Sequence, residues 1–222
     1  MSACRPAAFR PRRRNGCTTT HSGARFLNSH EAIVEAYQAE WAPIAAEERQ
    51  FYGQQRDLSS SIEVSAMSRD PENRRHPHQR RFKKQTLRKA ADRLHNVQSN
   101  LSQCETFDDL FNVVYGTLAP IKGIGCKSNG VTPYDIADRI GLYLGLEPER
   151  VYAHAGTADG ARALGLRGKV IEVDQFPPAF RELTPHQIED CLCLYKKALW
   201  ALVRQAQSES PQVPKPLRVA AG

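Results

Sequence analysis

The residues best suited to do chemistry form a short glycine-rich turn, Gly123-Ile124-Gly125, with the lysines Lys122 and Lys127 beside it. Glycine adopts left-handed backbone angles without strain and has no side chain to keep a ligand away from the main chain. The apolar residue between the two glycines can anchor the turn in a core. The N–H groups of such a turn, with those at the start of a following helix, can then point outward and bind a phosphate oxygen. We therefore predict a phosphate clamp at these five residues, against the alternative of a tight turn with no ligand.

A second concentration of positive charge precedes this turn. Residues 74–93 carry nine basic side chains and one acidic side chain, Asp92. Apolar residues recur between Phe82 and Leu94 at helical spacing, which predicts a basic amphipathic helix that begins near Pro77. The residues expected to contact phosphate are Arg80, Arg81, Lys83, Lys84 and Arg88. The alternative is a solvated helix face that binds nothing.

Strong helical patterns flank the glycine turn and must position it. Thr106 opens a capping box before an apolar stripe that ends near Pro120. Pro133 occupies the first position of the next helix, and Gly145 ends that helix. In this second helix, we interpret Asp135 as part of the cap and Asp138 as a surface residue.

The remaining patterns predict a mainly α fold with at most one short strand or extended segment, near residues 169–173. A helix beginning near Asn28 should be interrupted at Pro43. The final helix should begin at a capping box at Thr184 and carry a long apolar stripe. We expect one helical domain over residues 28–207, with its hairpin at residues 107–146.

Both ends of the chain are expected to be disordered. Residues 1–27 contain six arginines and no acidic residue, and residues 208–222 are rich in proline and polar residues. The basic arm fits a DNA-contacting tail or a targeting peptide. A translation start upstream of the native one would explain it equally well.

The composition narrows the class of protein. The chain has 222 residues, of which 41% are hydrophobic, and a formal net charge of +7, which favours an anionic partner. No stretch has the 18 to 20 apolar residues, roughly, that a membrane span needs, so no membrane partner is expected. The six cysteines have neither zinc-site nor disulfide-framework spacing. These features predict a cytoplasmic protein with free thiols and without a metal or other cofactor.

With a helix on each side, the turn resembles the helix-hairpin-helix motif of DNA repair and recombination proteins. In that motif, a Gly-hydrophobic-Gly turn binds the DNA backbone without reading bases. The resemblance runs from about Phe107 to Leu146 and includes the small Ala137 and Gly141, where two helices could approach closely. It implies sequence-nonspecific DNA binding, in DNA repair or in a mobile-element or defence context.

A weaker resemblance extends to about Tyr195 and is to the helix-hairpin-helix DNA glycosylase superfamily. It is carried by Val151-Tyr152-Ala153-His154 and by the segment 161–166. Tyr152 stands where that family places its catalytic aspartate, so catalysis is not expected from this position. Lys127 falls near the family's Schiff-base lysine, but an inserted segment before the helix places it on a loop.

Tyr152 and His154 could instead line a pocket, although a core tyrosine and a buried histidine are the ordinary interpretation. Two other functions stay open beside DNA binding. One is a divergent glycosylase or abasic-site lyase, with Lys127 as its candidate nucleophile. The other is a structural helical protein that binds a protein partner and no nucleic acid.

Overall fold

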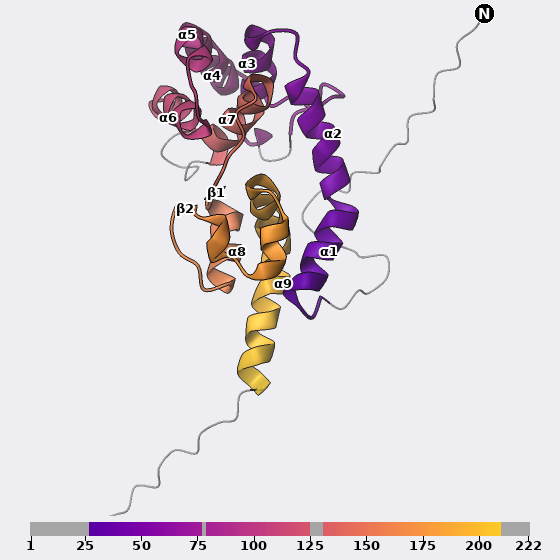
Figure 1. Ribbon diagram of the computed structural model, residues 1–222. Coiled ribbons are helices and arrows are strands. Elements are labelled where there is room, and N and C mark those ends of the chain that lie inside the picture. Colours follow the sequence, from indigo (N-terminus) through magenta and orange to yellow (C-terminus); the bar gives the residue numbers. More distant parts are fainter. Residues whose placement is uncertain (1–26, 77–78, 125–130, 210–222) are drawn as a thin grey trace, which may run out of the picture.

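The computed structural model describes residues 27–76, 79–124 and 131–209, which are mainly helical (Figure 1). The α-helices are α1 (His30–Glu40), α2 (Ala42–Gly53), α3 (Leu58–Ala66), α4 (Lys84–Asn96), α5 (Gln98–Ser102), α6 (Phe107–Leu118), α7 (Val131–Leu144), α8 (Ala155–Ala163) and α9 (Pro185–Glu209). The 3-10 helices include η2 (Val173–Gln175) and η3 (Pro178–Glu182). The strands β1 (Val151–Tyr152) and β2 (Val170–Ile171) pair antiparallel, so the predicted extended segment has a partner strand. Nearly all of the predicted arm and tail lies outside the described residues.

The helix ends follow the capping residues. The Thr106 hydroxyl accepts the Asp109 N–H at 3.1 Å, which confirms the predicted start of α6. The Thr184 hydroxyl accepts the Gln187 N–H at 3.3 Å at the start of α9. The first helix is capped by Ser29, one residue after the predicted cap, because its hydroxyl accepts the Ala32 N–H at 3.2 Å. Each cap satisfies a backbone donor that has no partner within its helix.

The basic helix starts later than its sequence indicates. α4 begins at Lys84, so Arg80, Arg81 and Lys83 precede it and are not helical. Tertiary hydrogen bonds hold this preceding segment in its own conformation. The buried Gln79 amide accepts from the Ser68 hydroxyl at 2.9 Å and donates to the Asp135 carboxylate. The prediction of a helix from Pro77 was wrong because charge and periodicity do not reveal these distant partners.

The described residues build two hydrophobic cores. One core unites α1 with the C-terminal half of the chain, and its buried residues include Ile33, Tyr37, Phe176, Phe180, Leu192 and Leu199. The other core lies among α3, α4, α6 and α7, and its buried residues include Ile62, Leu94, Leu110, Leu118, Ile124 and Ile140. We call the first group (α1, β1, α8, β2, η2, η3, α9) the terminal lobe. The second group, together with α2, which packs against α7, is the hairpin lobe (Figure 1).

The described chain passes between the lobes at two places. The first is the interruption at Trp41 between α1 and α2, which occurs beside Pro43 as predicted. The second is β1, where the side chain of Tyr152 belongs to the hairpin core while Val151 and Ala153 belong to the terminal core. Few residues therefore connect the lobes covalently, and contacts across their seam must fix how the lobes lie.

The packing of α8 against α9 depends on Gly160. A Cβ atom at this position would lie 2.5 Å from the backbone oxygen of Leu192. Backbone cannot move aside as a flexible side chain can, so α8 would have to shift away from α9. We expect Gly160→Ala to lower the free energy of unfolding by about 2 kcal/mol, as overpacking does. Urea denaturation of the two proteins would measure the difference.

Gly116→Ala is the matched control for this substitution. Gly116 lies within α6, and a Cβ atom there would meet no atom within 4 Å. Because alanine favours a helix over glycine by about 1 kcal/mol, this variant should be as stable as the wild type or more stable. Equal effects of the two substitutions would show that α8 and α9 adapt to the added methyl group.

Candidate nucleic-acid interface

The glycine turn is described as far as Ile124, and its geometry fits the predicted anchor. Gly123 has a φ angle of +97°, in the region that favours glycine. Ile124 is fully buried in the hairpin core, while Lys122 is exposed. Gly125 and Lys127 lie outside the described residues, so the second half of the predicted clamp is not placed.

One donor of the turn is used within the turn. The Ile124 N–H donates to the Ile121 carbonyl at 3.0 Å, and the Ile121 N–H donates to the Leu118 carbonyl at 2.9 Å. Ile124 is therefore a hydrophobic anchor and does not offer its N–H to a ligand, contrary to the prediction. The N–H groups of Lys122 and Gly123 have no acceptor among the described residues, so they are the donors that this part of the turn can offer. A clamp therefore depends more on the neighbouring cations than the sequence indicates.

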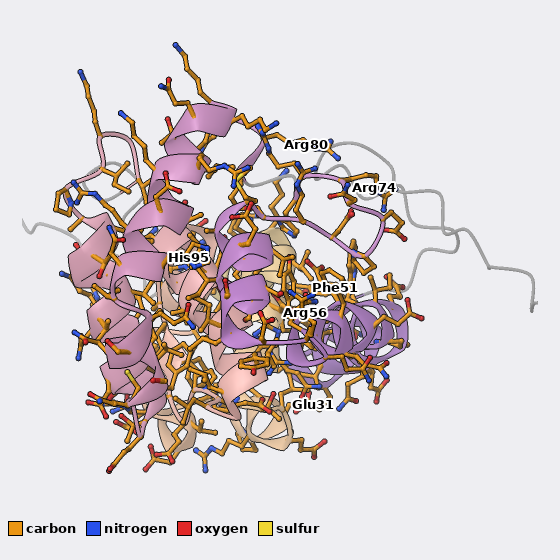
Figure 2. All side chains as sticks on the ribbon, turned by 90° about the horizontal axis from the view of Figure 1, so that it is seen from above. Glu31, Phe51, Arg56, Arg74, Arg80 and His95 are labelled. Atoms are coloured by element: carbon orange, nitrogen blue, oxygen red, sulfur yellow. The ribbon has the colours of Figure 1, made fainter. Side chains whose placement is uncertain are left out.

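Many of the arginines near α4 are held by the protein itself. The Arg74 guanidinium pairs with Asp70 at 3.1 Å. Arg75 donates to the Phe82 carbonyl at 2.9 Å, and Arg80 donates to the Arg75 carbonyl at 3.2 Å. Arg74 and Arg80 lie along the same edge of the hairpin lobe (Figure 2). These contacts hold the segment before α4 in place, so part of the predicted phosphate-binding charge is structural.

Arg88 is engaged in the same way. Its guanidinium pairs with the Glu63 carboxylate of α3 at 2.8 Å. Arg81 differs, because its guanidinium lies over the ring of Phe82 at 5.0 Å and remains exposed. A cation over an aromatic face keeps its N–H groups free for another acceptor.

A set of exposed lysines carries the charge that remains available. For these side chains no partner is found among the described residues, and they are Lys83, Lys84, Lys89 and Lys122. Arg93 connects the two parts of this surface, since its Nη1 atom donates to the Thr117 carbonyl at 3.4 Å. Thr117 is in the last turn of α6, immediately before the glycine turn. The basic helix and the hairpin are thus neighbours in space.

Tyr152 and His154 pack among aromatic side chains. Tyr152 is buried against the rings of Phe107 and Phe111, at 5.4 and 5.0 Å between centroids, and its hydroxyl donates to Asp108. Burial raises the pKa of this phenol. The His154 ring meets Tyr134 edge-on at 4.6 Å. Tyr152 is therefore a core residue, whereas His154 is half-buried.

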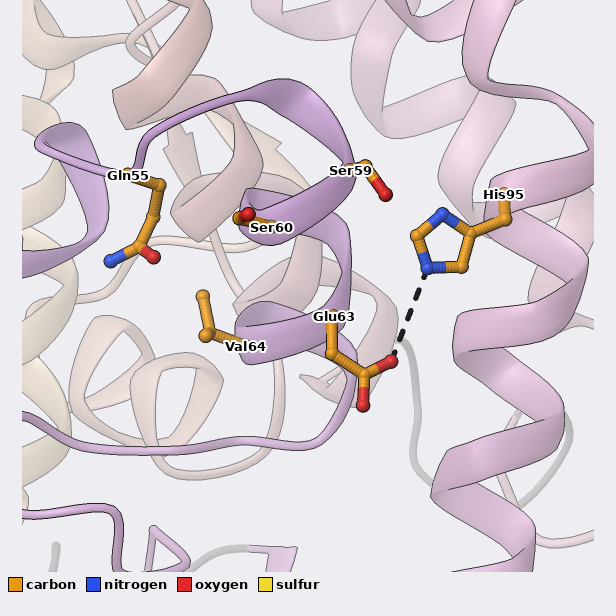
Figure 3. A pocket seen from close by; sticks show the side chains of 6 residues that line it. All are labelled: Gln55, Ser59, Ser60, Glu63, Val64 and His95. Carbon is orange, nitrogen blue, oxygen red and sulfur yellow. Dashed lines mark ion pairs between the residues drawn. The ribbon is translucent and has the colours of Figure 1, made fainter.

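A surface hollow lies between α3 and α4 (Figure 3). Its lining residues are Gln55, Ser59, Ser60, Glu63, Val64 and His95. The Glu63 carboxylate is 4.0 Å from the His95 ring and also pairs with Arg88. None of the predicted site residues lines this hollow. We assign it no function.

The seam between the lobes contains a group of buried ionisable residues that were not predicted from the sequence. Asp138, interpreted as a surface residue, is buried, and its carboxylate is 3.3 Å from Arg49 and 3.6 Å from His186. Asp135 is not a cap, because α7 already begins at Val131, and its carboxylate accepts the Gln79 amide instead. The sequence held one signal: His186, Glu189 and Asp190 are spaced to share one face of α9.

Two carboxyl groups of the seam bind protons unusually tightly. Burial, and then the charge of Asp190, raises the pKa of Glu189 well above its usual range. Burial also raises the pKa of Asp190, although the nearby His186 opposes this effect. Such shifts mark functional sites in some proteins and structural networks in others.

No helix among the described residues has the length and hydropathy needed to cross a bilayer. In the same part of the chain, no group of three or more His, Cys, Asp or Glu side chains is arranged to hold a metal ion. Three cysteines are described, Cys104, Cys191 and Cys193, and no disulfide joins any of them to another described residue. Comparison with family models, curated proteins and solved structures found no match to this chain.

Proposed function

We propose that this chain binds the DNA backbone, without reading base sequence, through its hairpin and the basic face of α4. The observation that carries the proposal is the contact from Arg93 to the Thr117 carbonyl. It brings the basic helix beside the end of α6, from which the chain leads into the glycine turn, so that two cationic segments separated in the sequence lie on one side of the hairpin lobe. Lys89 lies one helical turn before Arg93 on α4, and Lys122 follows Thr117 closely in the chain.

The chemistry of this surface suits phosphate and not base edges. Its available groups are mostly lysines, which act as point charges toward phosphate oxygens. The Gly123 N–H adds a main-chain donor beside Lys122. Sequence is usually read by planar groups that form paired hydrogen bonds in the major groove, and these lysines cannot do so. Sequence-nonspecific binding follows.

The test removes three lysines from the proposed surface. The variant Lys84→Ala, Lys89→Ala, Lys122→Ala should bind a short duplex more weakly. Each phosphate contact contributes about one unit to the slope of log affinity against log salt. The slope should therefore become about three units shallower, as measured by fluorescence anisotropy.

A matched control removes three exposed cations from the terminal lobe instead: Lys169→Ala, Lys197→Ala, Arg204→Ala. Both triple variants lose the same net charge. If both weaken binding equally, net charge and not this surface drives it. If the wild type does not bind duplex or single-stranded DNA at all, the proposal is wrong.

A further inference from the structure

The His186 ring bridges the seam between the lobes. Its Nδ1 atom lies 3.6 Å from Asp138 of the hairpin lobe, and its Nε2 atom lies 3.5 Å from Asp190 on its own helix. The exposed fractions of the His186 and Asp138 side chains are 13% and 12%. Because these ionisable groups are so little exposed, a change of charge among them is costly.

Other ionisable groups lie around this contact on the adjoining elements. They are Tyr37 from α1, Arg49 from α2, Tyr134, Asp135 and Arg139 from α7, His154 at the start of α8, and Glu189 and Cys191 from α9. Carboxyl groups outnumber the arginines among them, and Arg49 is shared, since it also binds Glu147 at 2.6 Å. A further negative charge in this seam would add to this excess of acidic groups.

Glu189 is the group at which that charge would appear. It is buried beside Thr157, whose hydroxyl donates to it, and its carboxylate is 3.6 Å from His154. The same pair lies next to Tyr134 of the hairpin lobe, which His154 meets edge-on. Ionisation of Glu189 would favour an arrangement in which water can reach the carboxylate, because a charge buried beside other carboxylates is costly.

We propose that this seam is a proton-dependent latch between the two lobes, which proton uptake closes and proton loss loosens. The two chain crossings at Trp41 and Tyr152 leave the lobes able to move relative to each other. The proposal does not depend on DNA binding, because the latch lies in a different part of the molecule from the lysine surface.

The direction of the pH effect follows from the carboxyl groups. In the closed seam the pKa of Glu189 is raised, so the closed state binds the proton more tightly than the open state. The stability of the closed state is complete below the usual glutamate pKa, about 4.3, and is lost as pH rises through the raised value. For one proton, the ratio of open to closed molecules rises up to about tenfold per pH unit within this window.

Hydroxyl-radical footprinting of the full chain at several values between about pH 5 and about pH 9 would detect the opening. Tyr37 and Tyr134 are buried at the seam and report on it. Tyr52, buried in the hairpin lobe, reports on general unfolding, and the exposed Tyr115 normalises the radical dose. We expect labelling of Tyr37 and Tyr134 to rise with pH by up to about tenfold per unit, while labelling of Tyr52 stays constant.

Glu189→Gln removes the proton while keeping an acceptor for the Thr157 hydroxyl. In this variant the rise in labelling should disappear, whereas Glu182→Gln, an exposed control on the same lobe, should behave as the wild type. Asp190→Asn serves as a second variant if Glu189→Gln does not fold, and it should reduce the rise. A flat wild-type response, an unchanged rise in the seam variants, or an equal rise at Tyr52 would each overturn the proposal.

Discussion

The affinity of the wild-type chain for a short DNA duplex is expected to fall about five-hundredfold as salt rises from about 50 to about 200 mM. Binding to phosphates releases condensed counterions, so each neutralised phosphate adds about 0.9 to the steepness of the slope of log affinity against log salt. The structure has five exposed cations near the hairpin that no described residue engages through a hydrogen bond or ion pair: Arg81, Lys83, Lys84, Lys89 and Lys122. Five contacts predict a slope of about −4.5.

An anisotropy titration at four or more salt concentrations would measure this slope. The slope distinguishes available cations from arginines that are held by contacts within the protein, because the held arginines should add little to it. If Arg74, Arg75, Arg80, Arg88 and Arg93 also contacted phosphate, the slope would approach about −9. Affinity that does not change with salt would exclude the backbone-binding surface altogether, whatever the absolute affinity.

The parts of the fold that were predictable from sequence depend on local rules. Thr106 and Thr184 fix helix starts through hydrogen bonds to residues three positions away. Gly145 ends α7 with a φ angle of +72°, and the Leu146 N–H then donates to the Gly141 carbonyl at 2.8 Å. This 6→1 hydrogen bond, from an N–H to the carbonyl five residues earlier, is typical of the Schellman motif at a helix that ends at glycine. Each signal needs only a few neighbouring residues, so one sequence suffices to find it.

The errors came from contacts between distant residues. Gln79 meets Ser68 and Asp135, and these partners determine that the segment before Lys84 is not helical. Asp138 was interpreted as a surface residue because no sequence pattern reveals that Arg49 and His186 reach it from other helices. Buried charged groups need partners, and those partners are found only after the helices are packed.

Only part of the candidate site was predicted, because the rest depends on contacts between distant residues. The anchor role of Ile124 and the exposure of Lys122 follow from the apolar and polar pattern of the turn. Whether a given arginine is available depends on its carbonyl or carboxylate partner in space. Of the five basic residues predicted to contact phosphate before and within α4, Arg80 and Arg88 are engaged by the protein. Charge density in a sequence therefore overestimates the charge available for a ligand.

The same distinction between engaged and available charge applies to Arg49, whose loss should be costly for stability. Its guanidinium pairs with Asp138 at 3.3 Å, and the exposed fractions of the two side chains are 19% and 12%. Arg49→Met keeps the apolar stem and leaves the Asp138 carboxylate buried with less compensation. Removing one partner of a buried ion pair costs roughly 3–5 kcal/mol of stability. Here the pair is partly exposed and His186 also lies beside Asp138, so we expect a loss at the low end of this range, about 3 kcal/mol. Urea denaturation would measure the loss.

Two further variants separate the effect of the Arg49–Asp138 pair on stability from the effect of removing any arginine. Adding Asp138→Asn to Arg49→Met removes the uncompensated charge, so we expect the double variant to recover more than half of the lost stability. Arg56→Met is the surface control, because the Arg56–Asp57 pair is 86% and 45% exposed, and its loss should cost no more than about 0.5 kcal/mol. If Arg49→Met and Arg56→Met prove equally mild, the seam is already hydrated in the folded protein. Water would then compensate the Asp138 charge, and the packing of the lobes would not depend on Arg49.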